Sequence, residues 1–338
     1  RKGYAVQAAG TSAIPTLEAL HAARAGLAGV INPTPLQLSR TIGAMTGATV
    51  WLKPECLQVA GSFKIRGAYT KVAGLSPEER ERGVITYSSG NHAQGVACAA
   101  RLLGAKAVVV MPEDAVPAKV DATRGYGAHV EFCGTDSLQR QRRALELQAQ
   151  HGYTMIPPFD DPAIVAGQGT VGLEIVSELP DVEYVIVPVG GGGLVSGVSL
   201  GVKLSLRSAK VIGVEPEGAN DAQQSMRRGE VVTIDEVHTI ADGLRPKRVG
   251  ALNFAIIRQH VDAIVTVSDD DIRGAMRLLL LRAKLVVEPS GAVGIAALLA
   301  KKLDCAGKRV AVVLSGGNAD PAMLREILTE KASGDLAL

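Results

Sequence analysis

Hydrophobic and polar positions alternate along the chain in blocks that predict strands and helices in turn. Apolar runs of four to six residues, the length of buried strands, alternate with longer segments almost throughout. His92–Leu103 is rich in small residues and predicts a helix, and Lys119–Gly127 is a polar segment between two apolar runs. We expect strands at Val84–Tyr87, Ala107–Met111, His129–Phe132, Tyr184–Val189, Val211–Val214, Ala263–Val267 and Val310–Leu314.

This order of elements predicts an α/β fold with two domains. Strand–helix–strand units are right-handed and place their strands parallel, so we expect mostly parallel twisted sheets with helices on both faces. The units between 84 and 132 look self-contained, and Pro157–Pro158 follows them as a punctuation point. We therefore predict a small domain at 57–156, inserted into a large domain made of 1–56 and 157–338. A ligand site is expected in the cleft between them.

Composition and charge exclude several classes of protein. The chain has 338 residues and a net charge of +2, and no basic stripe interleaved with aromatic residues, so we expect no nucleic acid partner. No apolar run is long enough to span a membrane, and Arg1–Ala5 lacks the apolar core of a signal peptide. The cysteines lack the paired spacing of zinc ligands, and we interpret them as reduced core thiols. These features predict a cytoplasmic enzyme. The cysteines are Cys56, Cys98, Cys133 and Cys305.

Four consecutive glycines, Gly190–Gly193, connect a predicted strand to a segment that begins like a helix. Backbone without side chains lets N–H groups approach an anion closely, and the helix N-terminus adds partial positive charge, so a phosphate is the expected ligand. A P-loop requires Lys and then Ser or Thr after its last glycine, but Leu194 and Val195 follow here. The segment is therefore not a P-loop.

A dinucleotide fingerprint is the second alternative for this loop. Its third glycine would fall on Val195 or Ser196, which weakens the match. Glu215 does lie about where a ribose-binding acid would be. A nucleotide-dependent oxidoreductase therefore remains an alternative, while a small phosphorylated cofactor held within the loop fits better.

Three further segments carry chemical groups. Lys64 follows Phe63 between glycines, and small or apolar surroundings lower the pKa of such an amine and favour nucleophilic chemistry. Ser88–Gly95 places polar side chains and free backbone donors at a helix start, which suits a carboxylate. Leu314–Asn318 is a strand end that opens into glycines, and a simple turn explains it equally well.

In this order and spacing, the segments resemble those of the fold-type II pyridoxal-phosphate enzymes. They are GSFKIRGAY at 61–69, SSGNHAQG at 88–95, PVGGGGLVSG at 188–197, EPSGAVG at 288–294 and LSGGN at 314–318. Within that superfamily the chain is similar to the threonine/serine dehydratase and serine racemase family, from Thr34 to Asn318. The resemblance implies a tryptophan synthase β-like fold.

The resemblance also implies how pyridoxal 5′-phosphate is bound. Lys64 should form the internal Schiff base, and Asn91 should hydrogen-bond the ring oxygen. Ser315 should face the pyridine nitrogen, and a neutral hydroxyl there gives a mild electron sink that suits elimination. The residues implied for the cofactor are Phe63, Lys64, Asn91, Gly190, Gly191, Gly192, Gly193, Gly243, Glu288 and Ser315.

The implied substrate residues belong to the loop before the helix. Ser88, Ser89, Asn91 and His92 should surround the carboxylate of a small amino-acid substrate. Lys64 should remove the Cα proton on one face of the cofactor, with Ser89 as the acid/base on the other face. Many threonine dehydratases have alanine at that position, while serine racemases have serine.

A second resemblance concerns the segment 215–221, which is similar to the divalent-cation site of serine racemase and its metal-dependent relatives. The matching ligands are Glu215, the backbone carbonyl of Ala219, and Asp221. Hard oxygen ligands suit Mg²⁺, Ca²⁺ or Mn²⁺. An ordinary acidic loop is the alternative.

These residues imply an ammonia-lyase (dehydratase) that converts L-threonine, L-serine or another β-hydroxy amino acid to a 2-oxo acid and ammonia, with serine racemase activity left open. Ser89 and the Glu215–Asp221 pair keep threo-3-hydroxyaspartate dehydratase or serine racemase open as the main activity. Arg245 pairs with a second substrate carboxylate or is a surface arginine. A non-enzymatic amino-acid-binding protein on this fold is a further alternative. The family suggests a homo-oligomer, either a dimer or a tetramer.

Overall fold

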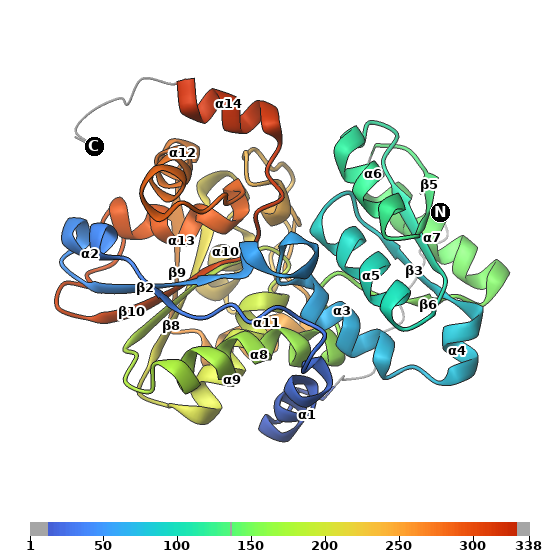
Figure 1. Cartoon of the computed structure of the whole chain (residues 1–338), viewed down its shortest axis with the longest axis horizontal. Helices are drawn as coiled ribbons and strands as arrows, with labels where there is room; N and C mark the ends of the chain where they lie inside the picture. The colour runs from blue at the N-terminus through green and yellow to red at the C-terminus, as the bar shows by residue number, and fades with distance from the viewer. Residues whose placement is uncertain (1–12, 136, 330–338) are drawn as a thin grey trace.

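A computed structural model describes residues 13–135 and 137–329, which form two α/β units that lie side by side (Figure 1). Arg1–Ala5, on which the signal-peptide prediction rests, lies outside the described residues. None of the described helices combines the length and apolar character needed to cross a bilayer. The four cysteines are free thiols; Cys56, Cys98 and Cys305 are buried as expected, whereas Cys133 is partly exposed and does not belong to the core.

Ten strands and fourteen α-helices build the described part of the chain. The strands are β1 (Gln37–Leu38), β2 (Thr49–Pro54), β3 (Val84–Tyr87), β4 (Ala107–Met111), β5 (His129–Phe132), β6 (Thr154–Met155), β7 (Tyr184–Pro188), β8 (Lys210–Pro216), β9 (Ala263–Val267) and β10 (Arg309–Leu314). The helices are α1 (Leu17–Leu27), α2 (Arg40–Thr46), α3 (Lys64–Ala73), α4 (Pro77–Arg82), α5 (Asn91–Leu102), α6 (Pro117–Gly125), α7 (Ser137–His151), α8 (Pro162–Glu178), α9 (Gly193–Ser205), α10 (Asp221–Arg228), α11 (Ala251–His260), α12 (Asp269–Leu278), α13 (Pro289–Leu299) and α14 (Pro321–Thr329).

The larger sheet has six strands in the order β1-β2-β10-β7-β8-β9. Only the β1–β2 pair is antiparallel among these strands. Its side chains alternate between two cores: Ile186 packs with α12 and α13, while Val185 and Val187 pack with α8, α9 and α11. Helices therefore cover both faces of this sheet, as the alternation of strands and helices predicts (Figure 1).

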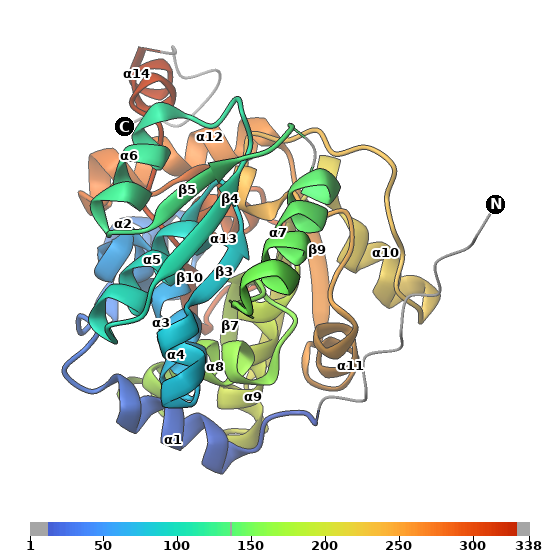
Figure 2. The ribbon, with the colours of Figure 1, turned by 90° about the vertical axis from the view of Figure 1, so that its right-hand side faces the viewer.

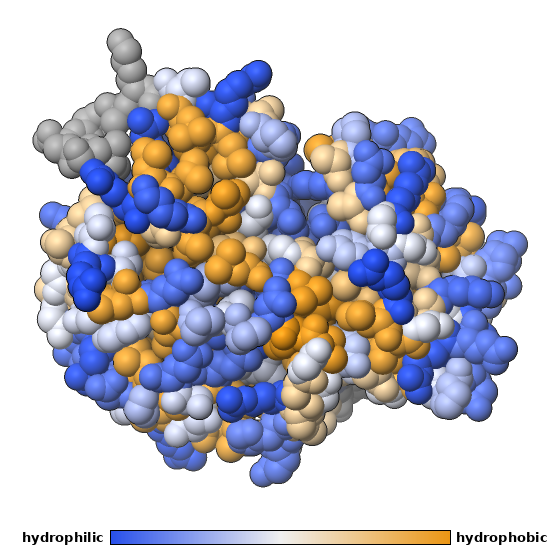
Figure 3. Space-filling model, in the orientation of Figure 1, coloured by the Kyte–Doolittle hydropathy of each residue, from blue (hydrophilic) through white to orange (hydrophobic). Residues whose placement is uncertain are grey.

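The smaller sheet has four parallel strands in the order β5-β4-β3-β6. Val84 and Val109 face a core formed with α3, α5 and α6, and Ile85 and Val108 face Ala144 and Leu147 of α7 on the other side (Figure 2). Its strands all lie within 57–156, and those of the larger sheet lie outside that range. The space-filling view shows a hollow between the upper parts of the two units (Figure 3). The α/β class and the mostly parallel sheets are confirmed, while the domain boundaries stay a prediction.

All seven expected strands are present, with ends shifted by one or two residues at most. Strand β2, which pairs with β10 near the middle of the larger sheet, was not predicted from the sequence. Lys53 lies in this strand and is 1% exposed, so the strand carries a charged residue in its interior. The two-residue strands β1 and β6 are also too short to leave an apolar run.

Helices α3, α8 and α9 pack at very short distances through glycines. A Cβ atom on Gly167 of α8 would lie 2.5 Å from the carbonyl oxygen of Arg66 on α3. On the other side of α8, a Cβ atom on Gly197 of α9 would lie 2.5 Å from the Gly169 nitrogen and the Val165 oxygen. Because these neighbours are backbone atoms, they cannot rotate away, and the helices would have to separate.

We predict that Gly197→Ala lowers the free energy of unfolding by about 1–3 kcal/mol, the usual cost of overpacking, even though alanine favours the helix itself. Denaturant unfolding of the purified protein measures this change. Gly26→Ala is the matched control, because Gly26 also lies within a helix but has no atom within 4 Å of its built Cβ. That control should be neutral or slightly stabilising. Equal effects of the two substitutions would contradict the account of helix packing.

Candidate active site

Lys64 is the first residue of α3 and extends toward the chain that follows the smaller sheet. Its Nζ donates a hydrogen bond of 2.7 Å to the carbonyl oxygen of Pro158, and it lies 5.3 Å from the centre of the Phe63 ring. Burial of the amine lowers the pKa of Lys64 from 10.5 to about 8, while the negative charge of Glu288 opposes this effect. A measurable fraction of this amine is therefore neutral near pH 7, as a nucleophile or base requires.

Four helices at this place begin without a side-chain cap: α3 at Phe63, α5 at Gly90, α9 at Gly192 and α13 at Glu288. Elsewhere in the described ranges, the residue before the helix caps five helices. Helices α6, α10 and α11 lack such a cap, although Glu215 and Asp160 accept hydrogen bonds from the first amides of α10 and α11. Uncapped N-termini leave N–H donors and a partial positive charge free for anions. The helices capped by a preceding side chain are α1 by Thr16, α2 by Ser39, α4 by Ser76, α8 by Asp161 and α12 by Ser268.

Contacts connect the four uncapped helix starts: α5 contacts α3 and α13 directly, and the glycine loop before α9 is connected to α13 through Gly243. On α5, Gly95 packs against the backbone of Lys64 (a built Cβ lies 3.1 Å from the Lys64 carbonyl carbon), and Asn91 Nδ2 donates to Glu288 Oε1 at 2.6 Å. A Cβ atom on Gly190 would lie 3.1 Å from the carbonyl oxygen of Gly243. The amide of Gly243 in turn donates to Ser290 Oγ of α13 at 2.9 Å. The structure thus brings the cofactor residues implied by sequence resemblance into one place.

The glycine loop has a shape that side chains would disrupt. Gly192 has φ +91°, which side chains rarely adopt, and a Cβ on Gly191 would lie 2.2 Å from Cδ1 of Phe159. The Gly191 carbonyl accepts hydrogen bonds from the Gly250 amide (3.1 Å) and from Asn253 Nδ2 (2.9 Å). With its carbonyl fixed in this way, the loop leads into an uncapped helix whose N–H groups suit a phosphate.

The N-terminus of the neighbouring helix α11, unlike that of α9, is bound by an acidic side chain. Asp160 accepts hydrogen bonds from the amides of Ala251 (3.0 Å) and Leu252 (3.1 Å), so a carboxylate already occupies that N-terminus. Phe159, Asp160 and Asn253 were not identified from the sequence. The only signal in the sequence is the run PPFDD at 157–161, whose first two residues, Pro157–Pro158, indicated a domain boundary.

Glu288 lies beneath the start of α5 and is 4% exposed. Burial, and then the charge of Asp242, raise the pKa of Glu288 to about 7, although the hydrogen bond from Asn91 works in the opposite direction. Asn318 Nδ2 donates to Asn91 Oδ1 at 2.8 Å and so fixes the amide of Asn91. A carboxyl group that titrates near neutral pH therefore lies beside the four helix starts.

The substrate residues implied for the 88–95 loop differ in their surroundings. His92 is 3% exposed, and its Nε2 lies 3.0 Å from the carbonyl oxygen of Ile156, which can only accept, so Nε2 carries the proton. Burial, and then the positive charge of Lys64, lower the pKa of His92 to about 3. Ser88 Oγ accepts a hydrogen bond from the Gly90 amide at 3.2 Å, and Ser89 is partly exposed. His92 is therefore neutral and turned toward Ile156.

Ser315 is 3% exposed, and its Oγ lies 3.5 Å from the carbonyl oxygen of Ser290, a long hydrogen bond. Arg245, by contrast, donates from Nε and Nη2 to the carbonyl oxygen of Thr239, at 3.2 and 2.7 Å. The guanidinium of Arg245 is therefore partly engaged by its own loop.

The proposed metal ligands lie at the carboxyl end of β8. Glu215 is fully buried and accepts hydrogen bonds from the amides of Ala222 (2.9 Å) and Gln223 (2.8 Å), which cap α10. Asp221 is 1% exposed, and its Oδ2 has no hydrogen-bond partner. Burial and the charge of Asp221 raise the pKa of Glu215, and burial raises the pKa of Asp221 to about 7.

No group of three or more His, Cys, Asp or Glu side chains able to hold a metal is found within the described residues. The implied donor set has only two carboxylates, and its third ligand is the carbonyl of Ala219, which is buried in the turn between them. A buried carboxylate oxygen without a partner, next to a second carboxylate, fits a divalent cation.

Comparison with known proteins identifies the family to which the chain belongs. A family model described as "Pyridoxal-phosphate dependent enzyme" matches residues 27–316. The chain is 47% identical to an L-threonine ammonia-lyase of Thermotoga maritima, over 93% of this chain and 78% of that protein. It is 44% identical to an L-threo-3-hydroxyaspartate ammonia-lyase of Saccharomyces cerevisiae, over 90% of this chain and 93% of that one. The structure of maize serine racemase superposes with a TM-score of 0.90 at 37% identity, over 94% of this chain and 97% of that one.

The neutral state of His92 predicts how the stability of the folded protein depends on pH. Because its pKa is lowered from 6.5 to about 3, the unfolded chain takes up a proton below pH 6.5 while the folded protein does not, so stability falls as pH falls through this range. His92→Gln keeps a donor for Ile156 but does not titrate. The stability of the wild type relative to this variant should fall by about 1.4 kcal/mol per pH unit below pH 6.5. Urea unfolding at pH 7, 6 and 5 measures this difference, and parallel curves would show that His92 is protonated in the folded state.

Proposed function

The chain belongs to the family of pyridoxal-phosphate dependent enzymes, and on that premise we propose that it is an ammonia-lyase for β-hydroxy amino acids. It is a lyase of the threonine/serine type, and its relatives include proteins named for threonine, for threo-3-hydroxyaspartate and for serine racemisation. The observation that carries the proposal is the amine of Lys64, with its lowered pKa, beside the uncapped N-terminus of α5.

The residues of the site fit pyridoxal phosphate. The loop 190–193 and the start of α9 would bind the phosphate, because they offer backbone donors where a Cβ has no room. Lys64 would hold the aldehyde carbon, with the Phe63 ring beside it. When bound, pyridoxal phosphate withdraws electrons from the Cα of an attached amino acid and makes its proton acidic.

Lys64 then has the properties of a base for that proton. Its pKa of about 8 leaves enough neutral amine near pH 7, and the carbonyl oxygen of Pro158 orients Nζ at 2.7 Å. The substrate carboxylate fits the start of α5, because the N-cap residue Gly90 provides no capping side chain for the first amides of the helix. Asn91 is already fixed by Glu288 and Asn318, so little ordering is needed when substrate binds.

Ser89 decides between elimination and racemisation in this proposal. It is partly exposed on the loop that begins α5, so its hydroxyl is accessible as a second acid/base group. Two such groups on opposite faces of Cα permit inversion, whereas Lys64 alone serves one enantiomer. Arg245 uses Nε and Nη2 in its hydrogen bonds to Thr239. Its other terminal nitrogen, Nη1, would bind the second carboxylate of hydroxyaspartate.

We propose a structural or activating divalent cation, most simply Mg²⁺, held by Glu215, Asp221 and the Ala219 carbonyl. Its attraction would offset the repulsion between two buried carboxylates and would occupy the partnerless Asp221 Oδ2. A homo-oligomer, as a dimer or a tetramer, and a cytoplasmic location stay predictions that the family resemblance suggests.

We predict that the purified protein with pyridoxal phosphate and Mg²⁺ releases a 2-oxo acid and ammonia from L-serine, L-threonine or threo-3-hydroxyaspartate. Lys64→Ala should abolish turnover because it removes the base. Ser89→Ala should abolish racemisation and attack on D-serine but spare elimination from L-serine. A coupled assay for pyruvate, 2-oxobutanoate and oxaloacetate, with chiral analysis of serine, measures each outcome.

Full turnover by the Lys64→Ala variant would contradict the assignment of the base, and racemisation by Ser89→Ala would contradict the role of Ser89. Ligand binding without ammonia release would instead favour an amino-acid-binding protein. Absence of both the yellow colour and a cofactor-bound lysine would favour the oxidoreductase.

The metal proposal predicts a pH-dependent effect on stability. The pKa of Asp221 is raised from 3.8 to about 7, so between these values the unfolded chain loses a proton that the folded protein retains. The stability of the metal-free protein should therefore fall as pH rises from about 4 to 7. Mg²⁺ should raise the melting temperature at pH 8 but not at pH 5, where Asp221 is protonated.

Asp221→Asn should abolish the Mg²⁺ effect at pH 8. Glu217→Gln is the matched control, because Glu217 is a nearby exposed acid that pairs with Lys302 instead. Equal melting temperatures of the wild type with Mg²⁺ and with a chelator at pH 8 would remove the metal from the account.

A further inference from the structure

A buried cluster of charges lies directly behind Lys64. Arg66 and Glu55 are fully buried, Lys53 is 1% exposed, and the Glu174 side chain is 18% exposed. The cluster holds two positive and two negative groups. The charges of Arg66 and Lys53 outweigh the effect of burial and lower the pKa of Glu174, so its carboxylate remains ionised.

Each N–H donor of the Arg66 guanidinium has an acceptor. Nε and Nη2 donate to the two oxygens of Glu55, both at 2.8 Å, and Nη1 and Nη2 donate to the two oxygens of Glu174 at 2.6 and 2.8 Å. The remaining Nη1 hydrogen is directed at Thr170 Oγ1, at 2.9 Å. Lys53 Nζ lies 2.7 Å from Glu174 Oε2. Four donors in two bidentate pairs, together with the fifth donor to Thr170, fix the guanidinium in position and in angle.

These contacts join three elements that are distant in sequence. Glu55 follows β2 of the larger sheet, and Thr170 and Glu174 lie one turn apart on α8. Arg66 is two residues after Lys64 on α3, about 200° around the helix axis, so the two side chains project from opposite faces. The cluster therefore holds α3 from behind, while Lys64 extends forward to Pro158.

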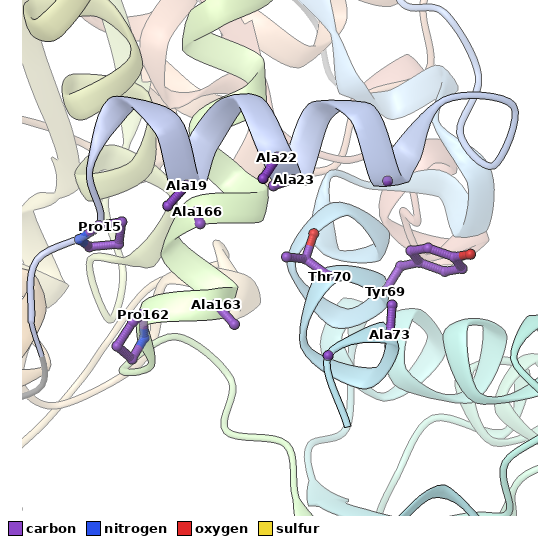
Figure 4. A pocket seen from close by; sticks show the side chains of 12 residues that line it. Pro15, Ala19, Ala22, Ala23, Tyr69, Thr70, Ala73, Pro162, Ala163 and Ala166 are labelled. Carbon is purple, nitrogen blue, oxygen red and sulfur yellow. The ribbon is translucent and has the colours of Figure 1, made fainter. Parts of the chain in front are cut away.

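The other half of α3 is less closely packed. A cavity of about 480 Å³ lies between α1, α3 and α8, and its lining includes Tyr69, Thr70 and Ala73 of α3 (Figure 4). Lys71 in that half makes a second ion pair to α8, with Asp161 at 2.7 Å. The strongest fixation of α3 thus occurs at the turn that carries Lys64.

A buried charge cluster is an expensive way to stabilise a fold, because an apolar set of similar volume is often as stable or more so. Unlike an apolar set, the bidentate pairs of the cluster fix the orientation of α3. We propose that Arg66, with Glu55 and Glu174, is a positioning residue that fixes the Nζ of Lys64 relative to the glycine loop. The role rests on the proposed function, since Lys64 is the amine that would hold the cofactor and move the Cα proton.

The test compares the holoenzymes of the wild type, Arg66→Lys, Arg66→Met and Thr170→Val, with Lys71→Met as the matched control. Thr170→Val removes one acceptor of Arg66 and leaves every charge in place. For each protein we would measure kcat and KM separately, and the rate at which hydroxylamine removes the cofactor from its lysine, followed by the visible absorption band.

For Arg66→Met we expect a fall in kcat of about 100-fold, the cost of displacing a reacting group by about 1 Å, with little change in KM. Hydroxylamine should remove its cofactor faster. Arg66→Lys should recover part of kcat, and Thr170→Val should show a smaller change in the same direction. Lys71→Met should resemble the wild type in kcat and in the hydroxylamine rate.

The proposal is overturned if Lys71→Met loses as much kcat as the Arg66 variants, because the effect is then general weakening of the α3–α8 contact. It is also overturned if Arg66→Lys and Thr170→Val both keep the wild-type kcat and hydroxylamine rate; these two variants decide the matter where Arg66→Met does not fold. The hydroxylamine rate needs no substrate, so it judges Arg66 even if the wild type releases no 2-oxo acid.

Discussion

The close packing of α3, α8 and α9 is the constraint on which the site depends. Helix α3 carries Lys64, and α9 begins in the glycine loop, yet the two are fixed relative to each other through α8. Gly167 meets the backbone at Arg66 on one side of α8, and Gly197 meets Gly169 on the other. Because backbone contacts backbone, helix packing sets the distance between the amine of Lys64 and the glycine loop, which is more than 120 residues away in the sequence.

The electrostatics of the site depend on the backbone N–H groups that have no capping side chain at the helix N-termini. The N-termini of α5 and α9 have no side-chain cap, while Asp160 occupies that of α11. The partial positive charge at the starts of α5 and α9 is thus available for a phosphate and a carboxylate. At the start of α11, Asp160 already neutralises it. Burial then lowers the pKa of Lys64 and raises that of Glu288, so both groups titrate within about a unit of neutral pH.

Local patterns in the sequence predicted much of this molecule. Strands such as β4 and β7 are continuous apolar runs. The motifs around Lys64, Asn91 and the glycines lie where strands end or helices begin, so they indicated the site. Contacts between distant segments left no such signal. Asn253 bonds to Gly191 from 62 positions away, and Glu174 bonds to Arg66 from 108. The charged interior of β2 was likewise invisible, because Lys53 is compensated only by tertiary partners.

The proposed function depends on one covalent attachment, that of pyridoxal phosphate to Lys64. Reduction of the cofactor-loaded protein with borohydride, followed by peptide mass spectrometry, identifies the lysine that holds pyridoxal phosphate. We predict a single modified peptide in which Lys64 carries the cofactor. Modification of another lysine, or an unmodified Lys64 in protein that retains the cofactor, would contradict the assignment of this site.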